Sequence, residues 1–250
     1  MLLIWESQVS EQVDILKNVL KTKPDALIVA SIQPSATIPI LEEYKKNNIP
    51  VLLVDTEADW NGQTMYIGTD HYELGKKAGA LLGSMLQPGS QVALIHSTIV
   101  NPDMVKRLKG ARDALEAIGI GVVKELPADN ESGEVKLAVR NILQTFPNIN
   151  GVFAAKDIIA IDTLKEFTEK ELQIPVVGTD GTMKMLKEVE EERISATIAQ
   201  NPYDMGYISV EKALKAIMGD QLEKRIDSGV DIMIKENSEE RIDFLTTRLK

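Results

Sequence analysis

The sequence of 250 residues contains no cysteine, which excludes disulfides, thiolate metal sites, iron–sulfur clusters and thiol nucleophiles. Its two histidines, His71 and His96, lie too far apart to form a helical ligand pair, so we do not expect zinc chemistry. Aromatic residues are also scarce, at two Trp, five Tyr and four Phe. We therefore expect neither a metal nor a cofactor.

The sequence also lacks an excess of positive charge and has no long apolar run. There are 28 Lys and Arg against 38 Asp and Glu, a net charge of −10, and no basic stripe, which argues against nucleic acid as a partner. No run of about 18 apolar residues is present, so no transmembrane helix is expected. The apolar start, Met1–Trp5, reads as a strand and lacks the features of a signal peptide.

What the sequence does contain is a repeated strand–helix rhythm. Hydrophobic residues make up 44% of the chain, enough to bury a core at this length. Short runs that are apolar at every position suit strands covered on both faces, and each is followed by a stretch with helical spacing. The expected strands are 2–5, 26–30, 51–54, 65–68, 92–95, 122–126, 152–155, 175–178, 194–200 and 230–234.

This rhythm occurs twice, in two series separated by the polar segment 56–64. Strands alternating with helices predict parallel sheets with right-handed crossovers. We therefore expect an α/β protein with two doubly wound parallel-sheet lobes. In such folds the ligand lies beyond the carboxyl ends of the strands, which directs the search for functional residues to the loops there.

Familiar catalytic motifs are missing from those loops. The sequence has no dinucleotide-binding or phosphate-binding glycine loop, no nucleophile elbow and no HExxH zinc motif. Asp55 at a strand end could be a phosphoacceptor, but that chemistry needs paired acidic residues for magnesium. We expect no catalytic residues.

The sharpest local signal is Val176–Thr182, which contains Asp180 and Gly181, with Ala196–Pro202 about twenty residues later. Alone, Asp-Gly after a strand is also typical of a tight turn that caps the next helix. Together with other segments, however, it resembles the sugar-binding periplasmic binding proteins of the ribose and galactose type, which share their core with sugar-responsive repressors. The other matching segments are 48–55, 67–70, 74–75, 151–157 and 234–237.

The resemblance implies a clamshell of two lobes joined by three crossing strands and closing on one monosaccharide. One lobe would comprise residues 1–69 and 201–227, and the other residues 70–200 and 228–250. Family members open with a further strand and helix before the segment that matches Leu2–Trp5. The first lobe is thus expected to be incomplete, short by one strand–helix unit, which predicts weak sugar binding by this chain.

The same resemblance implies a set of ligand-binding residues. Asp55 and Asp180 match the two sugar-binding aspartates, Arg107 the arginine that reaches over the pocket, and Gln200 the hinge glutamine. Two further positions of the set are Lys156, where many members have Asn, and Asn130, where some have an aromatic residue.

The chemistry of these groups suits a sugar, because carboxylate, amide and guanidinium groups can pair with several hydroxyls at once. Plainer interpretations remain open for two of them: Arg107 could be a solvated helix charge, and Lys156 a surface charge that pairs with Asp157. For His71 and His96 we expect no role in the site, with His71 decorating the start of a helix.

Three functions remain as hypotheses. The first is an extracytoplasmic solute-binding protein that delivers a pentose or hexose to an ABC-type transporter permease. The second is a sugar-sensing subunit of a histidine-kinase system or the effector core of a repressor, although no helix-turn-helix segment is present. The third, an enzyme of doubly wound architecture, is disfavoured by the missing catalytic motifs.

Overall fold

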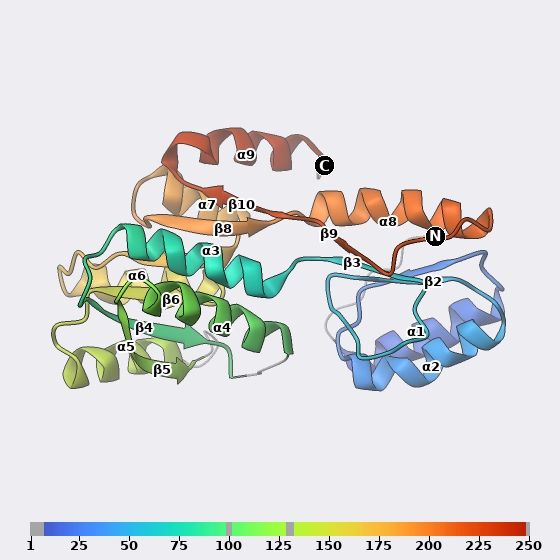
Figure 1. Cartoon of the computed structure of the whole chain (residues 1–250), viewed down its shortest axis with the longest axis horizontal. Helices are drawn as coiled ribbons and strands as arrows, with labels where there is room; N and C mark the ends of the chain where they lie inside the picture. The colour runs from blue at the N-terminus through green and yellow to red at the C-terminus, as the bar shows by residue number, and fades with distance from the viewer. Residues whose placement is uncertain (1–7, 99–101, 129–132, 249–250) are drawn as a thin grey trace. The chain divides into compact units, whose positions relative to one another are not determined.

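The computed structural model describes residues 8–98, 102–128 and 133–248, which form alternating helices and strands (Figure 1). They divide into two compact units. The first contains the described residues up to Thr69 together with Asn201–Gly229, and the second contains Asp70–Gln200 and the residues from Val230 on. The strand predicted at Leu2–Trp5 lies outside the described residues.

The first unit is built on a parallel sheet with the strand order β1-β2-β3-β9. One face is covered by α1 and α2, whose apolar residues pack on β1 and β2 around Leu53, while α8 covers the other face through Met205 and Ala213. The elements are α1 (Val9–Lys21), β1 (Leu27–Val29), α2 (Pro34–Lys46), β2 (Val51–Val54), β3 (Met65–Gly68), α8 (Pro202–Ile217) and β9 (Arg225–Asp227).

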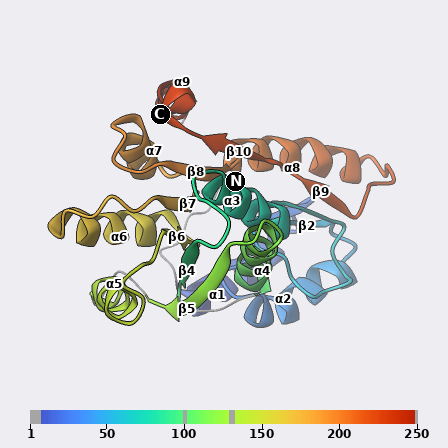
Figure 2. The same cartoon turned by 60° about the vertical axis from the view of Figure 1, so that its left-hand side comes forward.

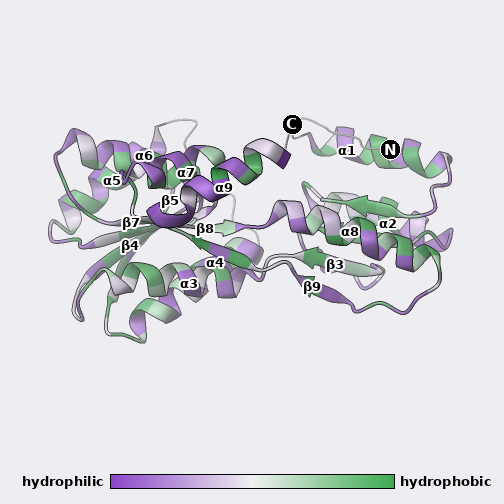
Figure 3. Cartoon of the chain, turned by 90° about the horizontal axis from the view of Figure 1, so that it is seen from above, coloured by the Kyte–Doolittle hydropathy of each residue, from purple (hydrophilic) through white to green (hydrophobic). Residues whose placement is uncertain are grey.

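The second unit has the strand order β10-β8-β7-β6-β4-β5, in which all pairs are parallel except that of the edge strand β10 with β8. Helices α3 and α4 pack on one face and α5, α6 and α7 on the other, as the view in Figure 3 shows. The elements are α3 (His71–Ser84), β4 (Gln91–His96), α4 (Pro102–Glu116), β5 (Gly121–Pro127), α5 (Glu134–Thr145), β6 (Gly151–Ala154), α6 (Asp157–Glu169), β7 (Val176–Asp180), α7 (Met183–Glu190), β8 (Ala196–Gln200), β10 (Val230–Met233) and α9 (Lys235–Arg248).

The predicted α/β fold with two parallel sheets is confirmed, and its central strands are buried on both faces, as their uninterrupted apolar sequences indicated. In β6, for example, Phe153 packs towards α3 and α4, while its neighbours Val152 and Ala154 pack towards α5 and α6. Some boundaries differ: the strand expected at 194–200 begins at Ala196, and α2 begins at Pro34. Proline suits the first turn of a helix because its missing N–H would have no partner there.

An exposed apolar stripe runs along α8. Tyr203, Tyr207, Val210, Leu214 and Ile217 follow one another at helical spacing, and the side chain of Tyr207 is 66% exposed. Ile28, in the middle of β1, the outermost strand of this sheet among the described residues, is 40% exposed. Contiguous apolar surface of this kind promotes association between molecules.

We expect the double variant Val210→Gln, Leu214→Gln to remain soluble at higher concentration than the unchanged chain. Both side chains are exposed, so the free energy of unfolding should change by less than about 0.5 kcal/mol. Light scattering during heating, together with denaturant unfolding, checks both parts. Scattering equal to that of the unchanged chain would show that the stripe does not drive association.

Candidate functional site

Two predicted site residues meet where neighbouring strands end. Asp180 is the last residue of β7 and Gln200 the last residue of β8, and the parallel register places Asp180 opposite Ala199. The side-chain amide Nε2 of Gln200 donates a hydrogen bond to Oδ1 of Asp180 at 3.0 Å. Sheet pairing alone therefore brings together a carboxylate and an amide at the carboxyl edge of the sheet.

Arg107, the third member of this cluster, comes from α4. Its Nη1 donates to the carbonyl oxygen of Ala155 at 2.7 Å, to Oγ1 of Thr179 at 2.8 Å and to Oδ1 of Asp180 at 3.0 Å. The residue is only 5% exposed, so the interpretation of Arg107 as a solvated helix charge is wrong. A buried guanidinium in contact with a carboxylate is a strong, directional hydrogen-bond donor.

Close packing of α3 against α4 positions this arginine (Figures 1 and 2). At Gly75 and Gly79 of α3, a Cβ atom would overlap the carbonyl oxygens of Arg107 and Ala111, and at Gly110 of α4 it would overlap the carbonyl oxygen of Tyr72. Glycines on both helices thus allow the two backbones to touch. Without that approach Arg107 would not reach the ends of β6 and β7.

The backbone of both predicted aspartates is unusual. Asp55 has φ = 65° and Asp180 φ = 127°. The other non-glycine residues with positive φ in the described chain come directly after helices, at Lys23, Asn48, Glu171 and Glu192, where this conformation is common. A non-glycine residue held at positive φ after a strand costs on the order of 1–3 kcal/mol, and such strained residues are concentrated at functional sites.

Gly181 continues the turn after Asp180 with φ = 77°. A Cβ atom at this position would overlap Ala199 on β8, with its Cα only 2.7 Å away. The turn therefore requires glycine, both for its positive φ and for its close approach to Ala199. The helix α7 that follows is capped by Thr182 rather than by Asp180. Asp180 is thus free of the capping role and directs its carboxylate to Arg107 and Gln200.

Asp157 lies beneath this cluster and is 1% exposed. Its Oδ2 accepts the backbone N–H of Thr182 at 2.6 Å, and its Oδ1 accepts the hydroxyl of Thr197 at 2.7 Å. Burial, followed by repulsion from the carboxylate of Asp180, raises the pKa of Asp157 to about 6. These hydrogen bonds, rather than a pair with Lys156, satisfy the Asp157 carboxylate.

The raised pKa of Asp157 predicts that this group makes the fold less stable as pH rises. The folded chain holds a proton on Asp157 that the unfolded chain has released, so this contribution is fully present below about pH 4 and lost as pH rises through about 6. Asp157→Asn keeps an acceptor for Thr182 and removes the charge. Its free energy of unfolding should exceed that of the unchanged chain by about 2 kcal/mol near pH 8 and match it near pH 4.

Denaturant unfolding of both proteins at the two pH values checks this expectation. Because the other titrating groups are common to both chains, the difference between them isolates Asp157. A constant difference across the pH range would show that the carboxyl of Asp157 does not titrate there.

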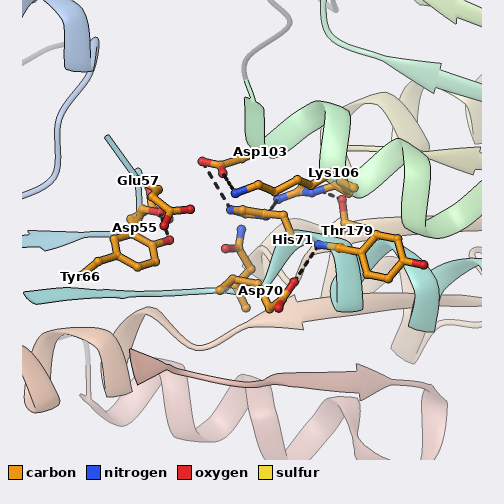
Figure 4. Close-up of polar contacts among 12 residues, drawn as sticks. Asp55, Glu57, Tyr66, Asp70, His71, Asp103, Lys106 and Thr179 are labelled. Carbon is orange, nitrogen blue, oxygen red and sulfur yellow. Dashed lines mark hydrogen bonds and ion pairs between the residues drawn. The ribbon is translucent and has the colours of Figure 1, made fainter. Parts of the chain in front are cut away.

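Asp55 belongs to the first unit, where it follows β2. Its carbonyl oxygen accepts the hydroxyl of Tyr66 at 2.8 Å (Figure 4). The guanidinium of Arg225 lies 4.7 Å from the centre of the Tyr66 ring. Arg225 also pairs with Glu57. The carboxyl ends of β2 and β3 thus carry a second group of polar side chains around an aromatic ring.

The remaining predicted residues have different outcomes. Lys156 stands half-buried at the N-cap of α6, and Asn130 lies outside the described residues. The expectation that His71 only decorates a helix start is wrong, because it is buried and its ring nitrogen Nδ1 lies 3.2 Å from Nη2 of Arg107. Sequence reasoning also missed Thr179 as a partner of Arg107, although it is next to Asp180 in the same strand end.

Comparison with known proteins places the chain in a family. A profile of the periplasmic binding protein domain matches residues 5–221. The ribose import binding protein of Bacillus subtilis is 25% identical over 219 residues, which span 88% of this chain and 72% of that protein. The ribose import binding protein of Escherichia coli is 28% identical over 190 residues, spanning 76% of this chain and 64% of that protein.

Solved structures agree in fold. An ABC transporter periplasmic solute binding protein from Actinobacillus succinogenes, determined with bound D-allose, has a TM-score of 0.85 at 26% identity, covering 93% of this chain and 86% of that chain. A periplasmic ribose ABC transporter structure from Conexibacter woesei has a TM-score of 0.89 at 24% identity. The match covers 95% of this chain and 82% of that chain. The profile match extends over most of the sequence, and the chain belongs to the periplasmic binding protein family.

Proposed function

We propose that this chain is the sugar-binding component of an ABC-type importer and that its ligand is a monosaccharide of the pentose or hexose class. The observation that carries the proposal is the hydrogen-bonded cluster of Arg107, Asp180 and Gln200 at the carboxyl edge of the second sheet. The relatives add support, since they are named for ribose import and one solved neighbour contains D-allose.

The cluster suits a sugar because each hydroxyl both donates and accepts a hydrogen bond. Asp180 offers acceptor oxygens, Gln200 both an acceptor and donors, and Arg107 further N–H groups. Arg107 is already bound to strand ends, so it meets a ligand in a fixed position, which lowers the entropy lost on binding.

We further propose that Asp55, Lys156 and Asn130 complete the site, and that the lobes are residues 1–69 with 201–227 and residues 70–200 with 228–250. In this proposal, sugar hydroxyls bonded to both lobes stabilise the closed arrangement more than the open one. The difference in affinity shifts the population towards closure.

The family is one of solute-binding proteins rather than enzymes. No helix in the described chain is long and apolar enough to cross a membrane. We propose that a separate permease carries the sugar through the membrane and that this chain acts outside the cytoplasm, in keeping with relatives named for ribose import.

Calorimetric and thermal-shift titrations with D-ribose, D-allose and D-arabinose test the proposal, with an acyclic polyol as the control ligand. At a concentration one hundred times the dissociation constant, a bound sugar should add about 2.7 kcal/mol to the free energy of unfolding. A midpoint that none of the three sugars moves, even at tens of millimolar, would contradict the proposal.

A further inference from the structure

A buried imidazole is in contact with the guanidinium of the candidate site. His71 is the first residue of α3 and 6% exposed, with its Nδ1 3.2 Å from Nη2 of Arg107. Its Nε2 lies 3.8 Å from Oδ2 of Asp103, and Oδ1 of Asp103 lies 3.7 Å from Nζ of Lys106 (Figure 4). The imidazole is thus held between a donor on one side and a carboxylate on the other.

The partners determine which form of the imidazole fits. A guanidinium has only donors, so the Nδ1 that faces Arg107 must accept and cannot carry a proton. In the neutral ring the proton then lies on Nε2, which points towards the carboxylate of Asp103. A second proton, on Nδ1, would place N–H against N–H and a positive charge beside Arg107.

Several charged groups surround His71. Helix α4 supplies Arg107 and Lys106, which oppose protonation, and Asp103, which favours it. On the strand side, Asp180 pairs with Arg107, and Asp157 lies beneath Asp180. Asp70 caps the N-terminus of α3, where its carboxylate favours protonation of His71 and the helix dipole opposes it.

We propose that His71 is a positioning residue for Arg107: in its neutral form it accepts from Nη2 and fixes the guanidinium against Asp180, and its protonation releases the guanidinium and weakens sugar binding. This inference rests on the proposed function. The sequence offers a clean test, since His71 and His96 are its two histidines.

The first arm of the test compares three proteins by calorimetry with D-ribose and D-allose. The oxygen of an Asn side chain lies near the position of Nδ1 and accepts at every pH, so His71→Asn should bind equally well near pH 5.5 and near pH 8. His71→Leu, which lacks the acceptor, should bind about tenfold more weakly than His71→Asn at both pH values, the factor expected for one hydrogen bond to a charged group. The unchanged chain should match His71→Asn near pH 8 and bind more weakly near pH 5.5, where part of its imidazole carries a second proton.

This comparison separates His71 from its neighbours. Asp157 also titrates in this range, but it is present in all three proteins, so the difference in slope between the unchanged chain and His71→Asn belongs to His71. Equal slopes in those two proteins would overturn the inference.

The second arm needs no sugar. In a His96→Gln background, nitrogen-15 NMR spectra of the one remaining imidazole report its tautomer directly. We expect an unprotonated Nδ1 and a protonated Nε2 near pH 8, and a proton on Nδ1 at that pH would overturn the positioning role. If no sugar binds at any pH, the proposed function and the effect on affinity both fail, while this spectrum still decides whether His71 accepts from Arg107.

Discussion

Asp180→Ala should weaken sugar binding by about 2 kcal/mol or more, which is roughly a thirtyfold rise in the dissociation constant. The carboxylate of Asp180 is the common acceptor of Arg107 and Gln200, so its removal takes one acceptor from the buried guanidinium and one from the amide. Sugar hydroxyls facing this carboxylate would lose their acceptor as well. Titration calorimetry with D-ribose and D-allose measures the change.

Two further variants make this result interpretable. Asp180→Asn keeps the shape of the side chain but lacks the charge that pairs with Arg107, so it should bind with intermediate affinity. Asp243→Ala removes an exposed carboxylate from α9 in the same unit and should leave affinity unchanged. If Asp180→Ala binds as tightly as Asp243→Ala, then Asp180 is not part of the site.

Most of the fold could be predicted because its pattern is local. Strand β2 is apolar throughout and β4 is apolar between its two terminal residues, and amphipathic helices such as α1 and α5 repeat apolar residues at helical spacing. The two elements that were missed lack such a pattern. Strand β9 has one apolar residue among three and is defined by pairing with β3, while α9 is dense in charge and buries only Ser238 and Leu245.

The family resemblance pointed to Arg107, and strand order accounts for the meeting of two other residues of the cluster. Asp180 and Gln200 end adjacent strands of one sheet, so their meeting follows from the topology. The contact between His71 and Arg107 joins residues far apart in the sequence and depends on how closely α3 and α4 approach. The spacing of Gly75, Gly79 and Gly83 in α3, opposite Gly110 in α4, was the available signal for that approach.

Gly75→Ala should lower the free energy of unfolding by about 3 kcal/mol and weaken sugar binding as well. The added Cβ would overlap the carbonyl oxygen of Arg107 and lie 2.7 Å from its carbonyl carbon. These are backbone atoms, which cannot rotate away as a flexible side chain could, so α3 and α4 must separate. The loss should outweigh the gain of about 1 kcal/mol that alanine brings to a helix interior.

Gly206→Ala is the matched control, because Gly206 also lies inside a helix, α8, but a Cβ there meets nothing within 4 Å. That variant should be unchanged or more stable by up to about 1 kcal/mol. Denaturant unfolding of both variants, followed by calorimetry with D-ribose and D-allose, separates the helix propensity of alanine from the effect of the clash between α3 and α4. If Gly75→Ala matches Gly206→Ala in both measurements, helix contact at Gly75 does not position Arg107; if it is destabilised but binds normally, the guanidinium is held by its strand partners alone.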